Sequence, residues 1–350
     1  MKRGDIQSRT INVMRIILVV YVVMIHSYSG TRGVIDTGQY PVYKATAFFL
    51  SLEISQIAVP AFFFISGYLF FFGANTYREK LKNRTRTLVV PYIFWNTLII
   101  AAYLILENIP ALTPLFRGEA ISYRIPALLR EYWDGGSWDN GNGTPIVHQF
   151  WYIRNLIILS AISPAIAFCI KKIGWLFPAA LMAIWLFSPG QAFSVESAAF
   201  FSAGACFSIH GKDFMSFFVR MRTASYVIYP VLLVLNTTMR ENHYLLPMDR
   251  IGFIAGTIFT FNLIGQSIEK GTIRGSAALS GVSFFIFAMH DPMLTFVKRA
   301  AIKLSTAPLS DTFVTSLYFL APAITIGICI VTHILLRRYF PRFTKVITGR

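Results

Sequence analysis

Charged side chains are scarce in this chain of 350 residues, where only 14% of positions are Asp, Glu, Lys or Arg. A soluble domain usually has about 25% charged residues, so this supply could not cover a water-facing surface. Cysteine is also rare, and Cys169, Cys206 and Cys329 each lie inside an apolar run. Composition therefore excludes an ordinary soluble enzyme and a disordered protein. The cysteine spacing indicates neither a disulfide framework nor a metal site.

Several motifs of well-known enzyme classes are missing as well. The sequence contains no GxGxxG loop, no phosphate-binding P-loop, no HExxH zinc motif and no GxSxG nucleophile elbow. These absences count against nucleotide hydrolysis, metalloprotease chemistry and esterase chemistry built on a nucleophile elbow. We expect neither a bound metal nor a permanently bound cofactor.

Long hydrophobic runs are what the chain has in abundance, with 55% hydrophobic residues and a mean hydropathy of +0.56. A membrane-spanning helix needs about 20 mainly apolar residues. The sequence therefore predicts an all-α, polytopic membrane protein with about ten transmembrane helices, nine or eleven being the alternatives. The predicted spans are Ile11–Gly30, Thr46–Phe72, Thr87–Leu106, Phe150–Ile170, Gly174–Pro189, Ser194–Ile209, Thr223–Met239, Ile251–Ile268, Ser276–Thr295 and Thr312–Leu336. They form one membrane domain over residues 1–350, with spans over 11–336 and a long outer loop at 107–149.

The formal net charge of +16 gives information about the membrane topology of this chain. In a soluble protein such an excess would suggest a nucleic-acid partner, but these basic residues cluster between apolar runs. About two thirds of them fall in the segments that share a side with the amino terminus. This bias predicts that both termini are cytoplasmic and that the partner is a lipid bilayer, with no nucleic acid.

The first predicted span contains two ionisable residues, Arg15 and His26. Eleven residues at about 100° each return to nearly the same helix face, with a displacement of about 16 Å along the axis. Histidine can act as a general base at neutral pH, and arginine suits phosphate or carboxylate recognition. The alternative is that Arg15 is a topology anchor and His26 a hydrogen-bonding group between helices.

Other polar residues lie at the ends of predicted spans. A basic stretch from Arg78 to Arg86 precedes the third span, where it could bind a polyphosphate or simply follow the positive-inside rule. His148 and Trp151 open the fourth span, and His290 and Asp291 close the ninth. Each of these four residues either lines a cleft or marks a membrane boundary.

Taken together, these residues resemble the acyltransferase 3 family of bacterial integral-membrane acyltransferases over residues 10–335. The resemblance rests on ordered motifs: Arg15 with His26, the segment Phe62–Phe70, Arg84-Thr85-Arg86 before Pro91-Tyr92, His148–Ile153, Ser163-Pro164 and Phe287–Pro292. It implies O-acylation, most often acetylation, of an envelope glycan or glycolipid in the bacterial cytoplasmic (inner) membrane. It also implies a cytoplasmic acyl-CoA donor, in most cases acetyl-CoA, as co-substrate. The family's paired arginines are separated by two residues, whereas Arg84 and Arg86 are separated by one.

The resulting hypothesis is an acyltransferase in which His26 is the catalytic residue, as general base or as acyl carrier. Arg15, Arg84 and Arg86 would bind the donor, and His148, Trp151, His290 and Asp291 would line the cleft on the acceptor side. The rival hypothesis is a multi-span transporter or flippase for an anionic glycan or glycolipid, which also needs intramembrane charges. A non-catalytic partner in envelope biosynthesis is a third possibility.

Overall fold

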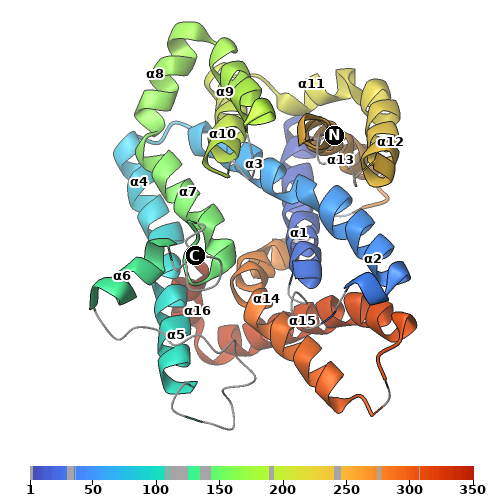
Figure 1. The fold of residues 1–350 in the computed structure, drawn as a ribbon. Coiled ribbons are helices and arrows are strands. Elements are labelled where there is room, and N and C mark those ends of the chain that lie inside the picture. Colours follow the sequence, from blue (N-terminus) through green and yellow to red (C-terminus); the bar gives the residue numbers. More distant parts are fainter. Residues whose placement is uncertain are drawn as a thin grey trace.

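The structure is a computed structural model of residues 1–350. It describes all residues except 1–2, 30–34, 36, 107–108, 110–124, 135–142, 189–192, 240–245, 274–276 and 307. The described part of the chain contains helices and no strands (Figure 1). The α-helices are α1 (Arg3–Ser29), α2 (Pro41–Ala47), α3 (Ala58–Phe71), α4 (Tyr77–Arg84), α5 (Val90–Leu106), α6 (Ile125–Asp134), α7 (Trp151–Ala161), α8 (Ser163–Ile173), α9 (Leu176–Phe187), α10 (Phe193–Ile209), α11 (Phe214–Arg220), α12 (Arg222–Met239), α13 (Leu246–Glu269), α14 (Ala277–Leu304), α15 (Asp311–Tyr339) and α16 (Pro341–Thr348). The shorter 3-10 or π segments are η1 (Thr37–Gln39), η2 (Phe48–Ile54), η3 (Ser55–Ile57), η4 (Thr85–Val89) and η6 (His148–Phe150).

Five helices in the described residues are long and apolar enough to cross a membrane. They are Ile6–Tyr28, Pro41–Phe71, Tyr77–Ile105, Pro247–Glu269 and Asp311–Tyr339. Two bent pairs, α7 with α8 at 64° and α11 with α12 at 70°, raise the number to seven if each pair is one span. The apolar helices α9 and α10 are shorter. The described part of the chain is thus all-helical, with five to seven helices long and apolar enough to span a membrane, whereas ten spans and cytoplasmic termini stay predictions.

The bend between α7 and α8 falls inside the predicted span Phe150–Ile170. Pro164 sits in the first turn of α8, where its missing N–H costs no hydrogen bond. The residue at the break, Ile162, has φ −87° and ψ 5°, outside the helical range. One predicted span is therefore two helices that meet at an angle.

The basic stretch before the third span is helical. Thr76 and Glu79 form a capping box that starts α4, since each side chain bonds the other's backbone N–H. The π segment η4 then joins α4 to α5, so the span begins at Tyr77, ten residues before the predicted start at Thr87. The arginines of this stretch consequently project from a helix.

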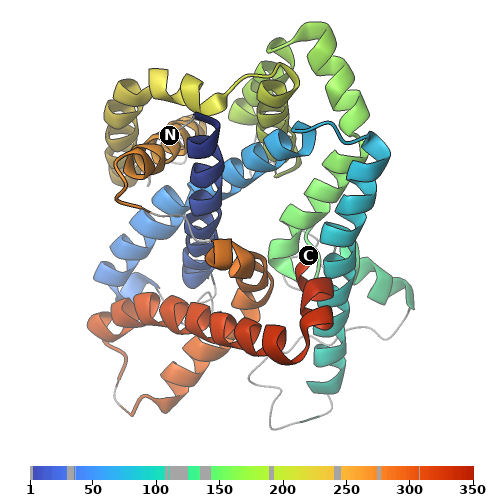
Figure 2. The same ribbon diagram turned by 180° about the vertical axis from the view of Figure 1, so that it is seen from behind.

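Helix α1 lies at the centre of the bundle and packs against α3, α13, α14 and α15 (Figures 1 and 2). Its residues Met14, Leu18 and Val23 are completely buried. Neighbours surround the helix on several sides, and Arg15 and His26 are both partly buried among them. This arrangement positions the two ionisable residues predicted from the sequence.

Helices α3 and α10 cross at very close range. A methyl group added at Gly67 would overlap the carbonyl oxygen of Phe201, and one added at Gly204 would overlap the carbonyl oxygen of Phe64. Two glycines therefore bring the backbones into contact, as is common where helices associate in membranes. The crossing fixes α3 and, with it, one wall of the site described next.

Candidate active site

His26 lies in the last turn of α1, beside two other histidines and an aspartate. Its Nδ1 atom is 3.5 Å from Oδ1 of Asp291 in α14. Its ring centroid is 5.0 Å from that of His290 and 6.0 Å from that of His148, both in edge-to-face geometry. The structure thus brings together four of the residues predicted from sequence, from three elements far apart in the chain.

His290 is completely buried, and its hydrogen bonds define its tautomer. Its Nδ1 atom is 2.8 Å from the carbonyl oxygen of Phe287 and 3.1 Å from that of Ile286. Carbonyl oxygens only accept hydrogen bonds, so Nδ1 carries the proton and Nε2 holds a lone pair in the neutral ring. Among the described residues, this Nε2 atom has no hydrogen-bond partner. It is therefore a buried hydrogen-bond acceptor beside His26.

Lys298 extends this cluster, and the sequence analysis did not select it. Its side chain is only 2% exposed and donates a hydrogen bond to the carbonyl oxygen of Ser27, just after His26. It also interacts electrostatically with Asp291. The sequence did contain a pattern that points to Lys298: it lies seven residues after Asp291, so the two side chains share a helix face. Lys298 therefore ties α14 to the carboxyl end of α1.

The segment around η6 closes the site from another side. Gln149 donates hydrogen bonds to the carbonyl oxygens of Phe287, at 3.4 Å, and Ala288, at 3.2 Å, which joins η6 to α14. His148 Nδ1 is 3.1 Å from the Thr144 hydroxyl. Trp151 is 8% exposed and packs against Phe63 with ring centroids 6.0 Å apart, so it belongs to the core beside the cluster.

A second, cationic cluster lies towards the amino end of α1. Arg15 and Arg84 interact electrostatically with each other and with Tyr152 of α7. The Tyr152 hydroxyl is 3.1 Å from that of Ser66 in α3, and the Arg84 guanidinium lies 5.5 Å from the centre of the Phe70 ring. Within the described ranges, no carboxylate forms an ion pair with either arginine. The pair is therefore suited to an anionic ligand.

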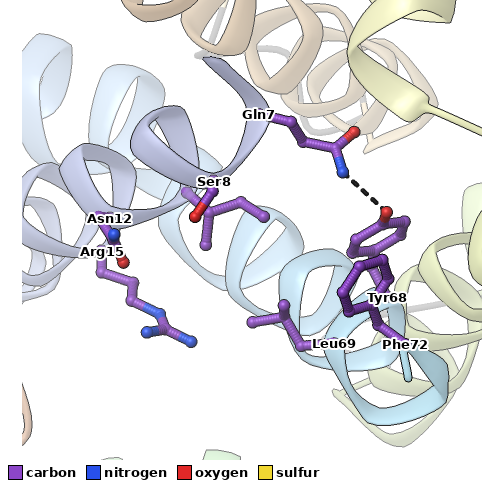
Figure 3. Close-up of a pocket in the computed structure, with 8 residues that line it drawn as sticks. Gln7, Ser8, Asn12, Arg15, Tyr68, Leu69 and Phe72 are labelled. Atoms are coloured by element: carbon purple, nitrogen blue, oxygen red, sulfur yellow. Dashed lines mark hydrogen bonds between the residues drawn. The ribbon is translucent and has the colours of Figure 1, made fainter. Parts of the chain in front are cut away.

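A cavity of about 150 Å³ opens between α1 and α3 next to Arg15 (Figure 3). Polar groups of Ser8, Asn12 and Arg15 line the α1 side, and Leu69 and Phe72 line the α3 side. At its far end, Gln7 donates a hydrogen bond of 2.7 Å to the Tyr68 hydroxyl. The cavity therefore has a mixed polar and apolar lining.

Arg86 does not join Arg15 and Arg84. Its side chain is exposed, and its Nη2 atom donates a hydrogen bond of 3.3 Å to the backbone carbonyl of Arg350. Residues two apart on a helix are about 200° apart around its axis, so the side chains of Arg84 and Arg86 point to opposite faces. The structure thus separates two arginines that the sequence analysis grouped.

The two clusters lie along a single helix. Arg15 and His26 are eleven residues apart, which places the cationic cluster about 16 Å from the histidine cluster along α1. In the described part of the chain, no three His, Cys, Asp or Glu side chains are arranged to hold a metal ion. The arrangement offers an anion site at one end and acid–base groups at the other.

Comparison with known proteins identifies relatives over almost the whole length. The family described as "Acyltransferase domain" (Acyl_transf_3) matches residues 9–334. The chain is 27% identical over 368 aligned positions to "Succinoglycan biosynthesis protein ExoH" of Rhizobium meliloti (strain 1021), covering 98% of this chain and 92% of that protein. No solved structure gives a significant match.

Proposed function

Because this chain belongs to the acyltransferase 3 family and is therefore an acyltransferase, we propose that it is a membrane-embedded O-acyltransferase of an envelope glycan or glycolipid. The donor in this proposal is a cytoplasmic acyl-CoA, with acetyl-CoA as the first candidate. The relative named for succinoglycan biosynthesis supports a polysaccharide-linked acceptor. The membrane in question is the bacterial cytoplasmic membrane.

In the proposed reaction, an acceptor hydroxyl oxygen attacks the thioester carbonyl carbon of the donor. The new C–O ester bond forms while the C–S bond breaks and coenzyme A leaves. His26 takes the proton of the hydroxyl and returns it to the departing thiolate, which balances the reaction. In the covalent variant, a nitrogen of His26 attacks the thioester carbonyl carbon, and the C–S bond breaks to release coenzyme A. The acceptor hydroxyl then attacks the same carbon, and the C–N bond breaks as the ester forms.

The residues around His26 have distinct roles in the proposed reaction. The Asp291 carboxylate, 3.5 Å from Nδ1, would orient the ring and stabilise the imidazolium that forms. His290 and His148 line the same space on the acceptor side. Arg15 and Arg84 would bind the phosphates of the donor, whose flexible arm would reach along α1 towards His26.

One observation supports this function above the others: the central helix α1 carries both Arg15 of the cationic cluster and His26 of the histidine–aspartate pair. An acyl-CoA needs both, because its phosphates and its thioester lie at opposite ends of the molecule. The transporter or flippase hypothesis needs only charges in the membrane and has no observation of its own that favours it.

The experiment compares envelope glycans and lipids by mass spectrometry from cells that produce the wild-type protein, His26→Ala or His210→Ala. We expect the acyl increment to disappear with His26→Ala, since general-base catalysis contributes about 10²–10⁴-fold. His210→Ala is the matched control, because His210 stacks on Trp175 rather than joining the cluster. An unchanged acyl increment with a folded His26→Ala variant would refute the proposal. Movement of the glycolipid without modification would support a flippase.

A further inference from the structure

The cavity between α1 and α3 lies beyond Arg15, on the side away from His26. Its lining residues Gln7, Ser8 and Asn12 all precede Arg15 on α1, whereas His26 follows Arg15 by eleven positions. The order along the helix is therefore cavity, cation and histidine. The proposed reaction uses the arginine and the histidine and assigns no ligand to the cavity.

Three polar side chains of α1 line this cavity without a hydrogen-bond partner. Ser8, Asn12 and Arg15 are spaced four and three residues apart, so they share one face of the helix. Among the described residues, none of these three side chains forms a hydrogen bond or an ion pair. Figure 3 shows them together along the α1 wall. A hydroxyl, an amide and a guanidinium can thus all bind a polar ligand in place of water.

The opposite wall of the cavity presents an aromatic ring. Phe72 directly follows α3, and its side chain is 63% exposed. Its ring stacks on that of Tyr68, with centroids 5.6 Å apart and planes inclined by 27°. Tyr68 is in turn held by the hydrogen bond from Gln7 (Figure 3). An exposed ring opposite polar side chains suits a flat heteroaromatic ligand, because nucleobases stack on aromatic side chains and form hydrogen bonds at their edges.

The volume of the cavity limits its ligand to a single ring system. One water molecule needs about 10–15 Å³, so a cavity of about 150 Å³ admits a group of about ten non-hydrogen atoms. A purine base has this size. An acyl-CoA carries its thioester at one end, its adenine at the other and its phosphates between them. This order matches His26, Arg15 and the cavity along α1.

We propose that the cavity binds the adenine of the acyl-CoA donor, with the Asn12 amide at the edge of the base and Phe72 against its face. A side-chain amide both donates and accepts a hydrogen bond, which matches the N6 donor and the N7 acceptor of adenine. This inference rests on the function proposed above and deepens it. It makes the donor a nucleotide-bearing thioester, whereas an acyl carrier protein would present phosphopantetheine without adenosine.

The test measures the binding of coenzyme A and of 4′-phosphopantetheine, which lacks the nucleoside, to the purified full-length protein in detergent by calorimetry. The proteins are the wild type, Asn12→Ala, Phe72→Ala and the matched control Asn83→Ala. Asn83 is an exposed asparagine of α4 that does not line the cavity. We expect Asn12→Ala and Phe72→Ala each to raise the Kd for coenzyme A about 5- to 100-fold, the value of an amide–adenine pair or a base stack. The control should leave this Kd unchanged.

Binding of 4′-phosphopantetheine should be the same in all four proteins, since this ligand keeps a phosphate for Arg15 and has no base for the cavity. It also shows that the variants are folded. Unchanged Kd values for coenzyme A in Asn12→Ala and Phe72→Ala would overturn this inference alone. So would an equal loss with both ligands, or equal binding of both ligands by the wild type, which would favour a carrier-protein donor. If the wild type bound neither ligand, the proposed function would fail as well.

Discussion

At the scale of single residues, the pairing of His26 with Asp291 leads to a prediction about rate. Replacing Asp291 with Asn keeps the size of the side chain and removes the charge that would stabilise the imidazolium. We expect the acyl-transfer rate at saturating donor to fall about hundredfold or more, with donor affinity unchanged. Initial rates and coenzyme A binding, measured on the same preparation, would check this expectation.

Asp213→Asn is the matched control for that substitution. Asp213 caps α11 by accepting a hydrogen bond of 2.8 Å from the N–H of Met215, and asparagine is an equally good cap. The control should therefore retain the wild-type rate. A wild-type rate for Asp291→Asn would mean that His26 works without an acidic partner.

The sequence allowed His26 to be chosen as a candidate residue, but it could not identify the partner of His26. Near His26 in the chain, the first acidic residue is Asp36, which lies outside the described residues. The carboxylate that the structure places beside the ring is Asp291, 265 positions along the chain in α14. Such a contact depends on how α1 and α14 pack, and no local pattern contains that information.

At the scale of helices, the crossing of α3 and α10 predicts an unusual sensitivity to one methyl group. Gly67→Ala or Gly204→Ala would drive a side chain into a backbone carbonyl of the other helix. We expect each to lower the stability of the protein by about 1–3 kcal/mol or more, because closely packed backbones cannot move apart independently. Thermal unfolding in detergent measures the change.

The control for these glycines is Gly327→Ala in the middle of α15. No atom lies within 4 Å of a Cβ at that position, and alanine favours a helix over glycine by about 1 kcal/mol. This variant should be neutral or slightly more stable. A similar loss of stability at all three glycines would show that close packing at the crossing is not the cause.

The helix boundaries in the structure can be compared with the spans that were predicted from hydrophobic runs. The runs located most helices, because burial in lipid or protein leaves an apolar signature of the correct length. They did not show that Phe150–Ile170 is bent at Ile162, although Pro164 was a visible signal. The π segments η2 and η4 leave no such signal, since an extra residue in a helical turn changes the phase without changing the hydropathy.

At the scale of the whole molecule, the contact of α16 with η4 bears on topology. A Cβ added at Gly349 would overlap the carbonyl oxygen of Thr87, so α16 and the basic stretch before α5 lie at the same end of the bundle. The charge distribution assigns these segments to the cytoplasm. We therefore expect α16 to be inaccessible from outside the cytoplasmic membrane and α6 to be accessible.

Cysteine labelling tests this topology in a Cys169→Ser background, since Cys206 and Cys329 are buried. Leu129, 66% exposed in α6, and Arg342, exposed in α16, are replaced singly by cysteine. An impermeant maleimide should label L129C in intact spheroplasts, and R342C only after the membrane is permeabilised. The reverse pattern would invert the topology and place the cationic cluster on the wrong side for a cytoplasmic donor.

Arg15 and His26 lie on one unbroken helix, so α1 fixes the distance between the two residues. In the proposed reaction, the distance from the anion site to the thioester is set by the number of residues between Arg15 and His26, at about 1.5 Å each, and not by the conformation of loops. A donor with a shorter arm would bind its phosphates and still fall short of His26. One residue inserted between Arg15 and His26 would rotate His26 by about 100° away from Asp291. Seven inserted residues would return His26 to the face towards Asp291 and lengthen its distance from Arg15 by about 10 Å. Under the proposed function, the length of the donor is therefore matched to the register of a single helix.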